Sequence, residues 1–195
     1  MWGMPYDRFK HHRRSIRLPG RDYAQPGAYF VTIVAKEREC LFGQVTDGEL
    51  ALNQYGEAVR EEWTRSAEIR DEIALDAFVV MPNHLHGIVI IRLGHGNDAP
   101  RRNVGATGRS PLHDHTYVHP AGPHPRSLGA FIAGFKSGAT KCINALRGTP
   151  GWPVWQRDFR DRIIRNEEEM CQKRTYITNN PMHWSRDEEN PANAR

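Results

Sequence analysis

The spacing of hydrophobic residues predicts strands in the first half of the chain. Stretches rich in aromatic and β-branched side chains favour extended structure, because such side chains fit a pleated surface. Two short apolar runs flank Thr46-Asp47-Gly48, and an Asp-Gly pair in that position is typical of a hairpin turn. Pro82-Asn83 separates two longer runs and favours a tight turn. The predicted strands are residues 28–35, 41–45, 49–52, 74–81 and 84–91.

Apolar residues at helical spacing predict three helices. Each helix follows a side chain that can accept hydrogen bonds from the free N–H groups of a helix start: Asn53, Ser127 and Asn166. We expect the first helix to reach about Ala67 and the second about Leu146. The third carries three glutamates in its first turn, where the helix dipole favours acids, and Pro181 should end it.

Three glycines interrupt the second predicted helix: Gly129, Gly134 and Gly138. Each costs about 1 kcal/mol relative to alanine in a helix interior. Either another group approaches the helix backbone closely at these positions, or the helix packs loosely against a strand. The sequence leaves both alternatives open.

Together these elements predict one α+β domain over residues 27–184, with helices packed on an antiparallel sheet. Residues 92–126 interrupt it with five Gly, five Pro and five His and almost no apolar periodicity, which favours a flexible insertion. Those histidines are irregularly spaced and make a weak case for a second metal site. Residues 1–26 form a basic N-terminal arm, and residues 185–195 form a polar tail that we expect to be loose.

Composition narrows the class of protein. The hydrophobic share is 38% and the mean hydropathy is −0.68, so we expect a modest core with polar extensions. No apolar run approaches the roughly 20 residues that cross a bilayer, and the N-terminus lacks the apolar stretch of a signal peptide. The three cysteines form no C-x-x-C pair, which argues against a disulfide framework or a cysteine zinc site. We therefore expect a cytoplasmic protein without a membrane partner.

The net positive charge is small, but the positive residues are clustered in the sequence. The formal net charge is +4, yet residues 1–23 hold six Arg or Lys against two Asp, and residues 127–147 hold three cations and no acid. Clustered cations suit a polyanion, because neutralising phosphates releases counterions. An ordinary solvated basic surface would explain the clusters equally well.

The first candidate for chemistry is His84-Leu85-His86, at the start of a predicted strand. Side chains two apart on a strand point the same way, so both imidazoles share one face and can hold one divalent ion. Two half-buried histidines with ordinary hydrogen bonds would give the same pattern.

The second candidate lies on the last helix, where Tyr176 and Asn180 are four residues apart and Lys173 lies one turn earlier. Met170 and Ile177 fall on the opposite side and can anchor this helix to the core. A lone tyrosine on such a helix is usually a core or rim residue. A residue that precedes proline is also pushed out of α conformation, which should displace Asn180.

Taken together, the motifs resemble those of a known family. MPNHLHGIVI, a basic helix, W-Q-x-x-F and YITNNP occur in the order found in the single-tyrosine HUH transposases, and the most similar branch is the REP-associated tyrosine transposases. The motifs are residues 81–90, 127–144, 154–169 and 176–181. The resemblance runs from about Ser15 to Trp184, and the insertion at 92–126 is long for this family.

The resemblance implies a fold, an activity and a site. The fold would be a ferredoxin-like antiparallel sheet, close to the RNA-recognition type, with helices on one face. The activity would be metal-dependent cleavage and rejoining of single-stranded, hairpin-forming DNA such as REP-like repeats, through a 5′-phosphotyrosine, in transposition or in repeat processing. His84, His86 and Asn180 would be metal ligands, Tyr176 the nucleophile and Lys173 an auxiliary cation. The ion would be Mg²⁺ or Mn²⁺, with Mn²⁺ better matched to imidazole and zinc less favoured.

Candidate DNA contacts follow from the basic segments, although any of them would also be unremarkable as a surface cation. Similar proteins read the foot of a hairpin with the stretch that holds Arg13 and Arg14. Trp152 and Trp155 are expected to be core residues, whereas Gln156 and Asp158 fit a structural or a contact role. The candidate DNA contacts are Arg13, Arg14, Arg17, Lys136, Lys141, Arg157 and Arg165.

Two rival functions remain to be weighed. A nucleotide hydrolase of the histidine-triad kind needs a third alternating histidine, and Ile88 stands at that position. A non-catalytic module that binds single-stranded DNA or RNA hairpins on the same scaffold stays open. The oligomeric state, monomer or homodimer, is also open.

Overall fold

A four-stranded antiparallel sheet forms the centre of the protein, in a computed structural model that describes residues 25–92 and 125–193. The strand order is β4-β5-β1-β6. Strands β1 and β5 pair along their whole length, with Gly27 opposite Ile91 and Val34 opposite His84. The strands of this sheet are β1 (Gly27–Val34), β4 (Ile73–Val80), β5 (His84–Ile91) and β6 (Arg160–Ile164). The α+β class and three of these strands confirm the sequence prediction, whereas β6 was not predicted.

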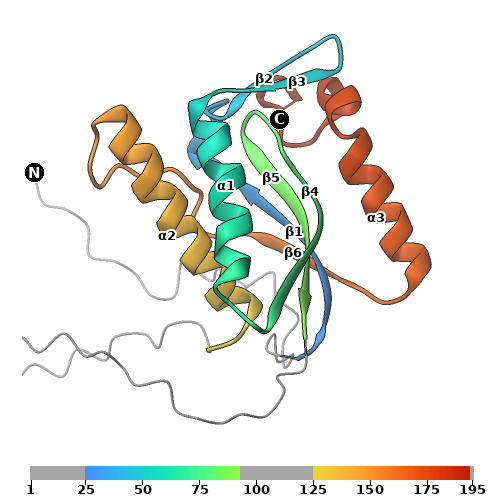
Figure 1. Ribbon diagram of the computed structural model, residues 1–195. Coiled ribbons are helices and arrows are strands. Elements are labelled where there is room, and N and C mark those ends of the chain that lie inside the picture. The colour runs from blue at the N-terminus through green and yellow to red at the C-terminus, as the bar shows by residue number, and fades with distance from the viewer. Residues whose placement is uncertain (1–24, 93–124, 194–195) are drawn as a thin grey trace, which may run out of the picture.

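Helices cover both faces of the sheet, as Figure 1 shows. Helices α1 (Gln54–Glu68) and α2 (Leu128–Arg147) lie on one face, and α3 (Glu167–Asn179) lies on the other. The expectation of helices on one face was therefore wrong. Strand β5 is buried almost throughout, on both of its faces, so each face needs a cover.

The predicted helix starts are confirmed by their capping hydrogen bonds. Asn53 accepts from the backbone N–H groups of Tyr55 and Gly56 at 2.9 and 3.1 Å. Ser127 and Asn166 each accept from the N–H three residues later, at 3.2 and 2.8 Å. Local sequence thus sets where each helix begins.

The larger core lies between the sheet and helices α1 and α2. Trp63 is fully buried there and meets the rings of Phe131 and Phe135 edge-on, with centroids 5.1 and 4.9 Å away. Gly134 and Gly138 of α2 face side chains from the α1 side: a Cβ on Gly134 would lie 2.5 Å from Arg70, and one on Gly138 would lie 2.2 Å from Glu62. Both neighbours are the ends of flexible side chains that can shift, so the two explanations of these glycines stay open.

A hairpin and the C-terminal segment lie together beyond the end of the sheet at which β5 begins (Figure 1). The hairpin consists of β2 (Gly43–Thr46) and β3 (Glu49–Leu52). Its turn uses the left-handed conformation at Asp47 (φ 53°) and Gly48 (φ 81°), as the Asp-Gly pair predicted. The C-terminal segment contains the 3-10 helices η2 (Pro181–Arg186) and η3 (Pro191–Asn193).

Two predicted segments lie mostly or wholly outside the described residues. These are the basic arm, of which 1–24 are not described, and the insertion, of which 93–124 are not described. Across the described ranges, every helix is too short or too polar to cross a lipid bilayer.

Candidate metal and tyrosine site

The two predicted histidines lie side by side at the start of β5, on the face that α3 covers. Their ring centroids are 4.4 Å apart, and their exposed fractions are 0% for His84 and 4% for His86. The pair lies where the C-terminal segment closes over the end of the strand. The histidines are therefore buried deeper than the half-buried pair that the sequence alone allowed.

Asn83 binds Nδ1 of His84 and Thr32 binds Nδ1 of His86, which turns both Nε2 atoms toward one space. Asn83 Oδ1 lies 2.8 Å from His84 Nδ1, and the Asn83 amide nitrogen donates to the carbonyls of Arg38 (3.0 Å) and Glu189 (2.6 Å). Those two bonds fix the amide, so its oxygen accepts and His84 must carry its proton on Nδ1. Nε2 of His84 then presents a lone pair, and it is buried with no hydrogen-bond partner among the described residues. An orphaned acceptor of this kind fits a metal ligand.

The protonation state of these imidazoles also favours metal binding. Burial, with added repulsion from His86, lowers the pKa of His84 to about 3. Burial likewise lowers the pKa of His86. Both rings are therefore neutral near pH 7, the state in which histidine binds a metal ion.

Asp187 completes a group of three possible ligands. Its Oδ2 lies 3.9 Å from His84 Nε2 and 4.0 Å from His86 Nε2, and its exposed fraction is 7%. Burial opposes ionisation of this carboxyl, but hydrogen bonding, which includes the bond from the amide of Asn180, outweighs it and lowers its pKa. The three ligand atoms lie within 4.8 Å of one another, so the group could hold a metal ion.

Sequence reasoning missed Asp187 because residues 185–195 were expected to be a loose tail. Instead, residues up to Asn193 are held by side-chain hydrogen bonds, including those from Asn193 Nδ2 to the carbonyls of Ser185 and Asp187, both 2.9 Å. The available signal was an acidic run, Asp187-Glu188-Glu189, a short distance after the last predicted helix of a basic chain.

The structure brings Tyr176 to the histidine pair within one chain. Its hydroxyl lies 3.3 Å from His86 Nε2, and Phe30 packs against both rings. The tyrosine is 43% exposed, so its edge is open to solvent. Burial of the other part, together with the charge of Asp187, raises its pKa. Near pH 7 the phenol is thus protonated and needs a cation to favour the phenolate.

Met170 and Ile177 are buried and hold this helix to the sheet, as predicted, but they do not lie on the side of α3 opposite Tyr176, because both they and Tyr176 pack against Phe30. Lys173 lies one turn before Tyr176, with its ammonium 4.5 Å from the centre of the Phe30 ring and 5.5 Å from that of Tyr176. A positive charge therefore stands beside the phenol, where the sequence placed it.

Asn180 also lies in the site, but in contact with Asp187. Its amide nitrogen donates to Asp187 Oδ2 at 3.0 Å, while its own Oδ1 is buried without a partner in the described part of the chain. The expected displacement before proline was wrong: Asn180 keeps helical angles (φ −57°, ψ −41°), because Pro181 opens η2 at the first helical position, where proline is tolerated. The role of Asn180 as the third metal ligand stays a prediction, and Asp187 is an alternative third ligand.

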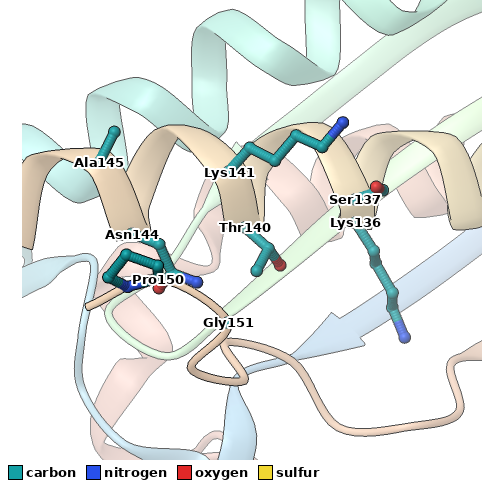
Figure 2. A pocket seen from close by; sticks show the side chains of 8 residues that line it. All are labelled: Lys136, Ser137, Thr140, Lys141, Asn144, Ala145, Pro150 and Gly151. Atoms are coloured by element: carbon teal, nitrogen blue, oxygen red, sulfur yellow. The ribbon is translucent and has the colours of Figure 1, made fainter. Parts of the chain in front are cut away.

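The side chains predicted to contact DNA differ in whether they are exposed or bonded within the protein. Lys136 donates to the carbonyls of Gln156 (2.9 Å), Arg157 (3.3 Å) and Asp158 (2.9 Å), so its ammonium secures that loop. Lys141 is exposed on the opposite flank of α2 and points away from the loop at Gly151 (Figure 2). Arg157 and Arg165 are exposed, and Arg13, Arg14 and Arg17 lie outside the described residues.

A cavity of about 550 Å³ lies between α2 and the loop at Pro150-Gly151, as Figure 2 shows. Lys136 and Thr140 are among its lining residues. Trp152, next along the chain, is 59% exposed, which corrects its expected place in the core, whereas Trp155 is 8% exposed.

Comparison with known proteins finds a relative by sequence and a solved structure with a similar fold. No family model matches the chain. An uncharacterized protein of Haemophilus influenzae is 35% identical over 178 residues, which cover 91% of this chain and 93% of that protein. A solved structure of a REP-associated tyrosine transposase bound to a REP hairpin superposes with a TM-score of 0.52 at 18% identity, covering 85% of this chain and 73% of the other.

A second solved structure, from Deinococcus radiodurans and named only provisionally as a transposase, reaches a TM-score of 0.41 at 16% identity, too weak a likeness to support an argument. It covers 84% of this chain and 97% of the other. The sequence resemblance is thus confirmed at the level of the fold. The chain belongs to the same family as the Haemophilus influenzae protein, and it has the fold of a REP-associated tyrosine transposase.

Proposed function

We propose that this protein is a metal-dependent endonuclease and strand transferase that acts on single-stranded, hairpin-forming DNA through a 5′-phosphotyrosine. The observation that carries the proposal is the meeting of Tyr176 with the histidine pair: 3.3 Å separate the phenolic oxygen from His86 Nε2. The solved transposase of the same fold is bound to a REP hairpin, which supports this substrate class.

The donor set suits a divalent ion of intermediate softness. Two imidazole nitrogens and one carboxylate oxygen favour Mn²⁺ over Mg²⁺, because Mg²⁺ prefers oxygen ligands. A bound ion would polarise the scissile phosphate and neutralise the charge that develops on it. His84, His86 and Asp187 would hold it, and Asn180 would orient Asp187 through the hydrogen bond already described.

The residues of the chain supply the nucleophile and its surroundings. The Tyr176 oxygen would form a bond to phosphorus as the bond from phosphorus to the 3′ oxygen breaks. The phenolic proton is lost to solvent and the leaving 3′ oxygen gains one, so protons and charge balance. Lys173 would favour the phenolate by opposing charge. Because one phosphodiester replaces another, the reverse reaction rejoins the strand without an external energy source.

A non-catalytic module that binds DNA or RNA hairpins is the alternative. It would use the same basic surface and the same α+β scaffold, and it would make no covalent bond to the nucleic acid. The orphaned Nε2 of His84 argues against it, because a mere binding surface gains nothing from a buried unpaired acceptor.

The test is covalent trapping with single-stranded hairpins whose flanks are randomised and whose 3′ ends are labelled. A 5′-phosphotyrosine leaves the 3′ label on the protein, so wild-type protein with Mn²⁺ should carry label through a denaturing gel. Tyr176→Phe should carry none while it binds hairpins with unchanged affinity. Tyr55→Phe, a partly buried tyrosine of α1 on the other side of the sheet, is the matched control and should behave as wild type. Hairpins bound by the wild type without any labelled protein would establish the binding module instead.

A further inference from the structure

We propose that Glu189 is a positioning residue that holds Asp187 in place as a metal ligand, so that residues 187–189 complete the site. The inference rests on the proposed function only in assuming that a metal ion binds. It goes further by giving a role to a carboxylate that is not one of the three possible ligands.

Glu189 is nearly inaccessible, with 2% of its surface exposed. Its carboxylate pairs with Arg38 Nε at 3.3 Å and also contacts Arg160 Nη2. Arg38 belongs to η1 (Lys36–Arg38), directly after β1, and Arg160 begins β6. A carboxylate near the end of the chain is thus held by cations next to two adjacent strands of the sheet. A buried charge of this kind is stable only when it is paired.

The backbone of Glu189 links both sides of the candidate site. Its carbonyl accepts from Asn83 Nδ2 at 2.6 Å, and Asn83 is the residue whose oxygen fixes the ring of His84. Its N–H donates to Asp187 Oδ1 at 2.7 Å. One residue therefore contacts the residue that orients His84 and also Asp187 itself.

That last hydrogen bond sets the direction of the Asp187 carboxylate. With Oδ1 bound to the Glu189 N–H, Oδ2 is the atom turned toward the imidazoles. Without the two arginine contacts the Glu189 side chain would lose its charge partners in the protein, and the backbone bonds of Glu189 to Asn83 and Asp187 would be weakened. Partners that orient a ligand typically contribute about 10- to 100-fold to metal affinity.

The experiment is a titration of the full-length protein with Mn²⁺ in the absence of DNA, with free Mn²⁺ followed by its electron paramagnetic resonance signal. Glu189→Gln keeps the shape of the side chain and removes its charge, so it should raise the Kd for Mn²⁺ about tenfold. Glu188→Gln is the matched control, because its neighbouring carboxylate is 90% exposed, and it should change the Kd by less than about twofold.

A double-mutant cycle shows whether Glu189 acts through Asp187. Asp187→Asn should weaken Mn²⁺ binding more than Glu189→Gln does. Adding Glu189→Gln to Asp187→Asn should then cost less than about twofold more, because the ligand to be positioned is already altered. A full tenfold loss in that background would overturn the proposal, since Glu189 would then act independently of Asp187.

Folding is checked by thermal unfolding without metal. If Glu189→Gln is unfolded at the assay temperature, Arg38→Gln replaces it as the milder change, and it should raise the Kd about threefold for the same reason. Unchanged affinity in the folded variant, or no Mn²⁺ binding by the wild type, would overturn the inference. Normal Mn²⁺ binding without covalent DNA attachment would instead contradict the proposed function and leave the role of Glu189 intact.

Discussion

The two faces of β5 differ in what they bury. Leu85, Val89 and Ile91 point into the core beneath α1 and α2, which also contains Trp63 and several phenylalanines. On the other face, the apolar cluster beneath α3 is small and holds Ile88. His84 and His86 lie at the end of that second face. Because side chains alternate along a strand, one face of β5 packs in the core that stabilises the fold, and the other face carries the candidate metal ligands.

Buried polar atoms without hydrogen-bond partners sharpen the contrast. In the described residues, those on the large-core side include the indole N–H groups of Trp63 and Trp155, which are donors. Those around the site include His84 Nε2 and Asn180 Oδ1, which are acceptors. Unsatisfied acceptors beside a buried carboxylate fit a cation, whereas isolated donors in an apolar core do not. The unpaired groups at the site thus cost stability that the other face must supply.

The largest expected effect comes from His84→Ala. Loss of a metal ligand should lower DNA cleavage about 10³-fold, because a metal ion supplies several kcal/mol at about 1.4 kcal/mol per tenfold. The free energy of unfolding in the presence of a chelator should fall by about 1–3 kcal/mol, less than for Trp63→Ala, because the lost ring is smaller and carried an unpaired buried atom. Single-turnover cleavage and urea unfolding measure the two quantities. A large loss of stability with near-normal cleavage would refute the division between the faces.

The reverse pattern is expected for Trp63→Ala on the other face. Removing this fully buried indole should lower the free energy of unfolding by about 3–5 kcal/mol. Cleavage per folded molecule should stay within about threefold of wild type, because Trp63 points away from the histidines. Urea unfolding and cleavage at a temperature where the variant is folded are the measurements. A loss of cleavage in fully folded protein would show that the faces are coupled.

Gly87→Ala tests the same contrast between adjacent residues of one strand. A Cβ there would lie 2.8 Å from Cζ2 of the Trp63 ring, whose body cannot move without disturbing the large core. Overpacking should cost about 1–3 kcal/mol of stability, as measured by urea unfolding. The change points away from the site, so we expect the Kd for Mn²⁺ to stay within about twofold. A tenfold weaker Kd would mean that packing under β5 controls the site.

Local patterns predicted most of the fold and half of the site. The helix starts at Asn53, Ser127 and Asn166 depend on residues within three positions, so the sequence determined them. His84 and His86 share a face by alternation alone. Their meeting with Tyr176 is a long-range event, 90 residues apart, and the family resemblance rather than any spacing predicted it.

The parts of the fold and of the site that were not predicted depend on tertiary contacts, which give little signal in the local sequence. Strand β6 is short and alternates arginine with partly buried residues, so it lacks the apolar run of an ordinary strand. Asp187 lies in a polar segment that no periodicity marks, and its burial results from contacts with Asn180, Asn193 and Glu189. A polar residue buried by its partners looks, in sequence, like a polar residue in solvent.

The smallest expected effect concerns the connection between α3 and the sheet. Arg174 binds Asp76 with two hydrogen bonds, Nε to Oδ1 and Nη2 to Oδ2, both 2.9 Å. This pair holds the helix that carries Tyr176 to β4, so Asp76→Asn should lower the free energy of unfolding at pH 7 by about 1 kcal/mol or less, because the arginine is partly exposed. Glu167→Gln, which removes an exposed partner of the same arginine, should cost less than about 0.5 kcal/mol.

The difference in unfolding free energy between wild type and Asp76→Asn should become smaller as the pH falls. The hydrogen bond from Arg174 outweighs burial and lowers the pKa of Asp76 from its usual value of 3.8 in the folded protein. Because the folded pKa is the lower one, the pair contributes its full stability above about pH 4 and loses it as the pH falls through the folded pKa. Urea unfolding at pH 7, 4 and 3 should show wild type and Asp76→Asn separated at pH 7 and 4 and closer at pH 3. A separation that grows in acid would mean that folding raises the pKa of Asp76, which would contradict its pairing with Arg174.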